Sequence, residues 1–385
     1  MKKIIFLISS FLFCIVFAGI IIFAGHTITP YYNSDQQSEP SIEKPKIVYT
    51  ETNNDETTIW MASPPNMTDR IALTRVKHAS GYPIKASVSP DGIRIAYTLL
   101  PFASTQPSSS GKLFLMDIRE RKPEELDDNI DYYIVPRWSS DSSNVVYIKT
   151  TILSQEKYRT ELYSTNLNGL KKVLLVDGRS LGINPIGYSL DGKQFYYDRI
   201  IPEGDELWGI NILANSNRII STTSIGSAWN LSISPDGKEI LGSVIKSRSP
   251  ASYAVISISV DGKKRYTWIE GAKMHYTPIW GPSARDITYN IPYYGYPTNP
   301  SDYRYGGELM KLNLLTKEKV SLSQSSEWMD VPISWSSDRN WLIIERYNSN
   351  SDMELKIVDY EGKDYQTKLP FNKATFIGWT QSSLK

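Results

Sequence analysis

Short runs of apolar residues, separated by polar turns, recur along this chain from about residue 46 to its end. The first complete example is the turn Ser89–Gly92 (Ser-Pro-Asp-Gly), with apolar-rich runs at 84–88 and 93–97 on either side. In such a turn proline presets φ to about −65°, aspartate hydrogen-bonds the backbone just downstream, and glycine accepts a positive φ. The pattern predicts a tight β-hairpin of two strands.

The same turn returns at intervals of about 44 to 55 residues. It is centred on Asp91, Asp141, Asp191, Asp236, Ser283, Asp338 and Ser382. We call these the marker turns. Between them, apolar residues alternate with polar ones in most runs, as half-buried antiparallel strands require. This repeat length is typical of the four-stranded blade of a β-propeller.

The two ends of the repeat region complement each other. Strands predicted at 46–50, 58–61 and 70–74 have no marker turn before them, whereas the last marker, around Trp379, has no strands after it. Together the two ends make one blade, which closes the ring and leaves only short sheet edges. The sequence therefore predicts an all-β, seven-bladed propeller of four-stranded blades over 46–385, with one blade shared by the N- and C-terminal ends.

The repeat resembles the WD40-like PD40 repeat of TolB-like β-propellers. It is also similar to the propeller domains of prolyl oligopeptidase and dipeptidyl peptidase IV relatives. The resemblance rests on the Ser-Pro-Asp-Gly turns at 89–92 and 234–237, and on Trp138 and Trp335 at the first position of a Trp-Ser-Pro-Asp-Gly motif that no copy carries in full. It covers roughly residues 46–382 and implies the fold. It implies no particular activity, because the repeat serves many unrelated roles.

The first 25 residues differ from the rest. After Lys2 and Lys3 the chain runs uncharged from Ile4 to Gly25, which is long enough to cross a bilayer. We predict an N-terminal membrane anchor (or uncleaved signal) over 1–25 and a flexible linker over 26–45, which is polar and contains three prolines. The two lysines place the N-terminus in the cytoplasm and the propeller outside it, in a bacterial cell envelope. The alternative is a protein secreted after signal cleavage.

Composition limits the classes of partner. The formal net charge is +1 and no long basic stripe is present, so nucleic acid is not an expected partner. The single cysteine, Cys14, lies in the predicted anchor, so the propeller has no disulfide. Its histidines are few and scattered and no Gly-rich phosphate loop opens a helix, so we predict neither a metal site nor a cofactor.

A tyrosine-rich loop is the strongest candidate for binding. The segment 293–305 belongs to the connections that emerge on the face opposite the marker turns, which we call the loop face. Tyrosine and arginine are enriched at binding hot spots because they combine contact area with a polar group. The alternative is a loop that folds over its own blade. The candidate side chains are Tyr293, Tyr294, Tyr296, Tyr303, Arg304 and Tyr305.

Residues that enter the innermost strands could line the mouth of the central channel. We include His275 and Asp330 among the predicted binding residues; the alternative is that such residues cap strand ends. Other residues at corresponding places are Tyr133, Asn184, Asn230 and Tyr276. The recurrent aspartates of the marker turns lie on separate blades, so we predict that each stabilises its own turn rather than a shared metal or catalytic centre.

No catalytic residues are predicted. Gly178–Gly182 matches the Gly-x-Ser-x-Gly elbow around Ser180, but the next residues begin another blade rather than a helix. The expected function is therefore non-catalytic binding of a protein, peptide or envelope glycan through the loop face. The alternative is a propeller hydrolase, of glycosidase or lactonase type, with carboxylates from Glu203, Asp205 or Asp330 at the channel mouth. A structural spacer in an envelope complex is a third possibility.

Overall fold

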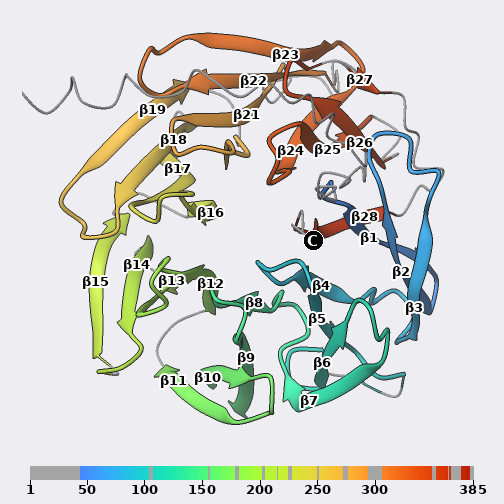
Figure 1. Ribbon diagram of the computed structural model, residues 1–385. Helices are drawn as coiled ribbons and strands as arrows, with labels where there is room; N and C mark the ends of the chain where they lie inside the picture. Colours follow the sequence, from blue (N-terminus) through green and yellow to red (C-terminus); the bar gives the residue numbers. More distant parts are fainter. Residues whose placement is uncertain are drawn as a thin grey trace, which may run out of the picture. The chain divides into compact units, whose positions relative to one another are not determined.

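The computed structural model describes residues 44–102, 104, 107–154, 157–177, 182–201, 204–214, 216–223, 228–248, 251–271, 276–293, 306–348, 353–362, 364–365 and 374–381. These residues form seven four-stranded antiparallel sheets. The sheets are arranged as the blades of a ring, with β28, β4, β8, β12, β16 and β24 around the centre (Figure 1). The predicted all-β, seven-bladed propeller is confirmed.

The strands of each blade are given from the centre outward. Blades 1 to 4 are β28 (Ala374–Trp379), β1 (Ile47–Asn53), β2 (Glu56–Ala62), β3 (Ile71–Lys77); β4 (Lys85–Val88), β5 (Arg94–Leu99), β6 (Gly111–Asp117), β7 (Pro123–Ile130); β8 (Arg137–Trp138), β9 (Asn144–Ser154), β10 (Lys157–Asn166), β11 (Lys171–Asp177); and β12 (Gly182–Tyr188), β13 (Gln194–Ile201), β14 (Gly204–Asn211), β15 (Ser216–Thr223). Blades 5 to 7 are β16 (Ala228–Ile233), β17 (Glu239–Arg248), β18 (Ala251–Ser259), β19 (Arg265–Gly271); β20 (Ile279–Trp280), β21 (Asp286–Pro292), β22 (Gly307–Asn313), β23 (Lys319–Ser325); and β24 (Met329–Trp335), β25 (Trp341–Tyr347), β26 (Met353–Asp359), β27 (Asp364–Tyr365).

Burial differs between the strands of a blade. The second strands are buried on both faces over several consecutive residues, as in Ile95–Thr98 of β5 and Phe195–Asp198 of β13. The third strands alternate instead, as β14 does from Gly204 to Gly209. Neighbouring blades cover both faces of a second strand, so its sequence can be continuously apolar. The core is therefore a set of apolar clusters between adjacent blades rather than one central core.

Each marker turn is held by its own side chains. In the turn of blade 2, Ser89 Oγ donates to Asp91 Oδ1 at 2.5 Å, and the same oxygen accepts from Ile93 N at 3.1 Å. The equivalent serine and backbone bonds recur at Asp141, Asp191, Asp236 and Asp338. Each carboxylate thus serves its own turn, which confirms the structural role predicted for these aspartates.

Tryptophans before the marker turns connect neighbouring blades. Trp138 Nε1 donates to the carbonyl oxygen of Ser87 at 3.2 Å, and Trp335 Nε1 donates to Thr288 Oγ1 at 3.0 Å. In each case the indole reaches back to the preceding blade. These bonds fix the spacing of the blades around the channel.

The ring closes non-covalently in blade 1. Strand β1 pairs with β28, so the blue and red ends of the chain lie side by side (Figure 1). Beyond the strands, Thr380 N donates to the carbonyl oxygen of Lys46 at 2.9 Å, and Lys46 N donates to Thr380 Oγ1 at 2.8 Å. The predicted sharing of one blade by the two ends is confirmed.

We expect Gly92→Ala to destabilise the ring more than Gly192→Ala. Both glycines occupy the same marker-turn position with φ near +70°, where a side chain alone costs about 1–2 kcal/mol. A Cβ at Gly92 would also lie 2.0 Å from Gln381 N, whereas the nearest atom to a Cβ at Gly192 is 4.0 Å away. The additional cost at Gly92 should be about 1–3 kcal/mol. Denaturant midpoints of the two variants test this, and equal midpoints would contradict the closure described above.

The two faces of the ring differ in their connections. The turn face carries the marker turns and the connections from third to fourth strands, and it is where the chain joins the ring at Lys46. The loop face carries the connections from second to third strands and those between blades. Within the described residues, no helix is long and apolar enough to span a membrane. The predicted anchor at 1–25 and most of the linker at 26–45 lie outside those residues.

Candidate functional site

The base of the tyrosine-rich loop lies on the loop face between β21 and β22. Tyr293 N donates to the carbonyl oxygen of Gly306 at 3.0 Å, which closes the hairpin, and the Tyr293 side chain is 44% exposed. A Cβ built on Gly307 would be 3.5 Å from the Met329 side chain, so the base adjoins the start of blade 7. The remaining predicted residues Tyr294, Tyr296, Tyr303, Arg304, Tyr305 and His275 lie outside the described residues.

Asp330 lies beside this base but is buried, at 3% exposure. Arg346 donates two hydrogen bonds to its carboxylate, from Nε to Oδ1 at 2.5 Å and from Nη2 to Oδ2 at 2.8 Å. Ser323 of blade 6 donates a third hydrogen bond to Oδ2 at 2.5 Å. The carboxylate therefore joins blades 6 and 7 and is turned away from solvent. A ligand at this place would meet the partly exposed Arg346 side chain before it met Asp330.

Aromatic side chains on the loop face extend beyond the predicted segment. Phe102 is 60% exposed, in a turn closed by Ser104 N donating to the carbonyl oxygen of Pro101. Tyr133 is 54% exposed, and its backbone N donates to Asp131 Oδ1 at 3.0 Å. Sequence analysis missed Phe102 because nothing in the sequence around a single phenylalanine tells whether it is buried.

Tyr133 belongs to a row of aromatic rings. Its ring meets that of Tyr132 edge to face, with centroids 5.5 Å apart, and Tyr132 in turn meets Tyr82 at 5.6 Å. The hydroxyl of Tyr132 donates to the carbonyl oxygen of Pro83. The buried rings hold Tyr133 in place, so its exposed ring is preorganised for contact.

The other predicted rim residues have mixed environments. Asn184 and Asn230 are exposed, whereas Tyr276 is 8% exposed and packs edge to face against Tyr289. Asn230 has a φ of 54°, a conformation that asparagine tolerates better than most residues. Tyr276 therefore serves the core between blades, Asn184 donates to Asp198, and Asn230 is exposed at the surface.

Two buried carboxylates lie near the loop face of blade 4. Asp198 on β13 and Asp205 on β14 are 2% and 3% exposed. Burial, and after it the negative charge of Asp205, raises the pKa of Asp198 to about 7, although Asn184 Nδ2 donates to its Oδ2 at 3.2 Å. Burial also raises the pKa of Asp205, whose Oδ2 accepts from Ala228 N of blade 5 at 2.6 Å. The sequence pointed to Asp205 but not to Asp198 as its partner.

The sequence analysis also considered Glu203 and Ser180. Both lie outside the described residues. Gly182, the last residue of the Gly-x-Ser-x-Gly segment, begins strand β12 rather than a helix. Within the described part of the chain, no three His, Asp or Glu side chains gather as metal ligands would.

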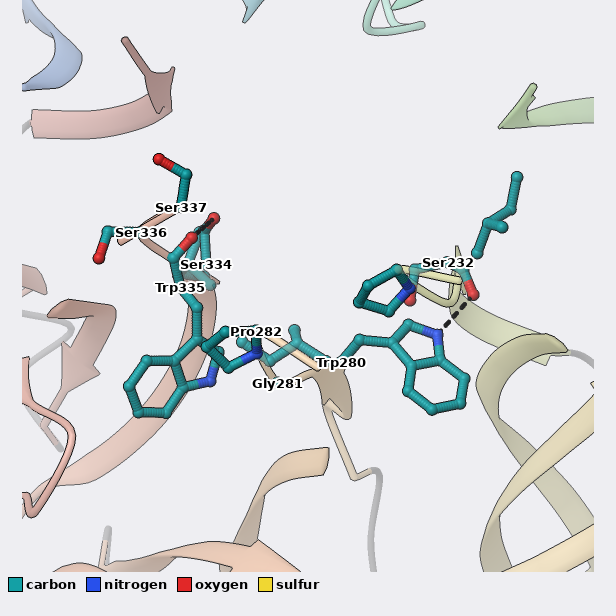
Figure 2. Close-up of a pocket in the computed structure, with 12 residues that line it drawn as sticks. Ser232, Trp280, Gly281, Pro282, Ser334, Trp335, Ser336 and Ser337 are labelled. Atoms are coloured by element: carbon teal, nitrogen blue, oxygen red, sulfur yellow. Dashed lines mark hydrogen bonds between the residues drawn. The ribbon is translucent and has the colours of Figure 1, made fainter. Parts of the chain in front are cut away.

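A cavity of about 330 Å³ opens where the innermost strands of blades 5, 6 and 7 approach their marker turns. Figure 2 shows Trp280 and Trp335 on either side of Gly281 and Pro282, with serines 334, 336 and 337 above Trp335. The Trp280 indole donates to the carbonyl oxygen of Ser232 at 3.1 Å (Figure 2). None of the residues that line the cavity is ionisable. It offers apolar contact and hydroxyl groups rather than acid–base chemistry.

Arg137 on the innermost strand β8 is a further residue that the sequence did not single out. Its side chain is exposed, yet desolvation by the protein around it lowers its pKa. From the innermost strand of blade 3 its guanidinium could bind an anionic group near the centre of the ring.

Known proteins of similar structure differ widely from this chain in sequence. No family model matches the sequence, and no match is found among curated proteins. A structure of prolyl endopeptidases matches with a TM-score of 0.59 at 10% identity, over 87% of this chain and 50% of that chain. The oligogalacturonate lyase of Vibrio parahaemolyticus matches with a TM-score of 0.54 at 13% identity, over 81% and 91%. TolB from Acinetobacter baumannii matches with a TM-score of 0.49 at 16% identity, over 74% and 64%.

The first two likenesses show the propeller fold. At identities of 10% and 13% they carry no information on activity. The chain spans about half the length of the prolyl endopeptidase chain and 64% of that of TolB. TolB and prolyl peptidase propellers, which the repeat resembles, are thus among the structural neighbours.

Proposed function

We propose that this protein is a non-catalytic binding module that holds a protein, peptide or envelope glycan on its loop face. The observation that carries the proposal is the set of exposed aromatic side chains there, Phe102, Tyr133 and Tyr293, which are 44–60% exposed. Large aromatic side chains at the surface supply most of the energy in many recognition sites. The tyrosine-rich segment 294–305 follows Tyr293 in the sequence.

The proposal includes the anchoring of the ring to a membrane. The uncharged run 4–25 serves as the anchor, and 26–45 serves as the tether that holds the propeller outside the cytoplasm. Because the chain joins the ring on the turn face, the loop face is the side left open to partners.

A second candidate, a propeller hydrolase, is favoured by one observation. Asp198 and Asp205 are neighbouring carboxyls in which one pKa is raised to about 7, the condition for an acid–base pair. Both side chains are buried, however, and Ala228 N occupies one oxygen of Asp205. A substrate would reach them only if residues around them moved. Binding by the exposed aromatic residues requires no such movement.

The binding proposal is tested by capture experiments with the full chain. We expect the triple variant Phe102→Ala, Tyr133→Ala, Tyr293→Ala, and a deletion of 294–305, each to lose at least about tenfold in recovery of partners from solubilised membranes or of peptidoglycan fragments. Tyr266→Ala, which removes a 39% exposed ring from the outer strand β19, is the matched control. Equal recovery by the triple variant and Tyr266→Ala would contradict the proposal.

A further inference from the structure

The turn face carries three exposed leucines that are presented in the same way. Leu170, Leu213 and Leu315 stand at the tips of the connections from third to fourth strand in blades 3, 4 and 6, and they are 70–80% exposed. In each turn the side-chain oxygen of an asparagine at the strand end accepts two backbone N–H groups, one of them from the leucine. These asparagines are Asn166, Asn211 and Asn313.

In the turn of blade 6, two consecutive leucines have opposite environments. Leu314 is buried and packs into its blade interface, while the next residue, Leu315, faces solvent. Leu190 adds a fourth exposed leucine, 59% exposed, in the marker turn of blade 4. The rigid turns therefore hold the side chains of Leu170, Leu213 and Leu315 outward, whereas Leu190 lies against Gly237 in the marker turn of blade 5.

Basic residues surround the leucines. The connections from third to fourth strand in blades 2, 3, 5 and 6, counted with one residue on either side, carry nine exposed basic and four acidic side chains, a net charge of +5, although the whole chain has a net charge of +1. The basic residues are Arg119, Arg121, Lys122, Lys171, Lys263, Lys264, Arg265, Lys317 and Lys319, and the acidic residues are Asp117, Glu120, Asp261 and Glu318. Together with the four leucines, the nine basic residues form what we call the leucine–basic rim.

Few of these charges are neutralised within the ring. Among the described residues, Lys171 is paired with buried Asp127 and Lys263 with exposed Asp261. Among the same described residues, no carboxylate is paired with Lys264 or Arg265, which follow Lys263 in blade 5. Blade 7 is the exception, because its corresponding turn carries Asp359 and Glu361. The excess of basic residues in these connections therefore falls on blades 2, 3, 5 and 6.

The chain joins the ring on this same face. Lys46 pairs with Thr380 at the turn-face end of blade 1, so the described chain enters β1 from that side. Exposed leucines among lysines and arginines are the chemistry with which peripheral proteins contact anionic lipid: the apolar tips enter the interface and the cations bind the headgroups.

We infer that the leucine–basic rim docks the turn face onto an anionic phospholipid bilayer. The ring then lies against the membrane rather than hanging freely from its tether, and the loop face points away from the lipid. The inference goes beyond the proposed function and draws on the proposed anchor only for the side from which the chain arrives.

The test uses the full chain in nanodiscs that contain a lipid-borne quencher. In a Cys14→Ser background, a fluorophore is attached at Thr316→Cys beside Leu315, or at Tyr133→Cys on the loop face. With phosphatidylglycerol discs we expect quenching at 316 at least about threefold stronger than at 133. The difference should disappear with phosphatidylcholine alone or in about 0.5 M salt, which screens charges beyond a few ångströms.

Charge reversal supplies the matched variants. Lys263→Glu, Lys264→Glu, Arg265→Glu together should abolish quenching at 316, whereas Lys77→Glu at the loop-face end of β3 should leave it unchanged. Equal quenching at 316 and 133 on phosphatidylglycerol would overturn docking and leave an acidic protein as the partner of this face. Membrane anchoring is measured separately, by whether the chain stays in the membrane fraction when membranes are washed with alkaline carbonate. If the wash releases the chain, so that the anchor is absent, quenching of the fluorophore at 316 by added phosphatidylglycerol vesicles still tests docking of the rim.

Discussion

Arg346→Met should lower the free energy of unfolding by about 3–5 kcal/mol, the cost of leaving one member of a buried ion pair without its partner. Asp330 is 3% exposed, and without Arg346 its charge would retain only the hydroxyl of Ser323 as a described side-chain donor. The pair links β24 and β25 within blade 7, and Ser323 adds a hydrogen bond to Asp330 from blade 6. Denaturant unfolding of the full chain in detergent, followed by tryptophan fluorescence, measures the change.

Asp330→Asn is the matched comparison. The Arg346 side chain is 16% exposed, so it can turn toward water when the carboxylate is lost. We therefore expect Asp330→Asn to cost less than Arg346→Met, and the double variant to be more stable than Arg346→Met alone. A loss below about 0.5 kcal/mol for Arg346→Met would show that the pair contributes no more to stability than an exposed surface ion pair.

Asp198→Asn should stabilise the protein, and more at pH 8 than at pH 5. The folded pKa of about 7 lies above the usual value of 3.8 that we take for the unfolded chain, so between them the folded state binds more protons than the unfolded state. The stabilisation that the Asp198 carboxyl contributes is fully present below its pKa in the unfolded chain, and it is lost as pH rises through its pKa in the folded protein. The loss amounts to about 4 kcal/mol by pH 8, and asparagine removes it.

Melting temperatures of wild type and Asp198→Asn between pH 4 and pH 8 test this prediction. Asp191→Asn is the control with the opposite sign, because hydrogen bonds from Ser189 and Lys193 lower the pKa of this exposed carboxylate. At pH values where Asp191 is ionised, Asp191→Asn should be less stable than the wild type. A difference between wild type and Asp198→Asn that does not change with pH would rule out a raised pKa for Asp198.

The fold arises from local sequence signals that repeat. A marker turn needs only Ser, Asp and a residue that accepts positive φ within about six positions, so each copy could be recognised on its own. Closure by the two chain ends could be predicted by counting the copies, and β1 does pair with β28. Even imperfect markers predict their hairpins, since Arg339 takes a φ of 66° where three other blades have glycine.

The candidate site was predicted only in part, because it depends on contacts between distant residues. Asp330 was expected at a channel mouth, but Arg346 on the adjacent strand encloses its carboxylate. Asp198 acquires its raised pKa from burial and from the charge of Asp205 on the next strand, which the residues around it in the sequence do not reveal. Tyr294 to Tyr305 and His275 remain predictions, since they lie outside the described residues.

The leucine–basic rim could not be found in the sequence for a related reason. Its basic residues occur in clusters of one to three, separated by about 50 residues or more, and each cluster alone is an ordinary polar turn. Only the ring brings these clusters from blades 2, 3, 5 and 6 to the same face. A net charge of +1 for the chain conceals the excess of basic residues in these connections.

The measurement that bears most directly on the proposed function is site-specific photo-crosslinking in intact cells. A photoreactive amino acid replaces Phe102, Tyr133 or Tyr293 on the loop face, or Thr316 on the turn face. We predict that the three loop-face positions yield the same covalent adduct with a protein or glycan, and that Thr316 does not yield it. An adduct from Thr316 with that same partner, and none from the loop-face positions, would contradict binding through the loop face.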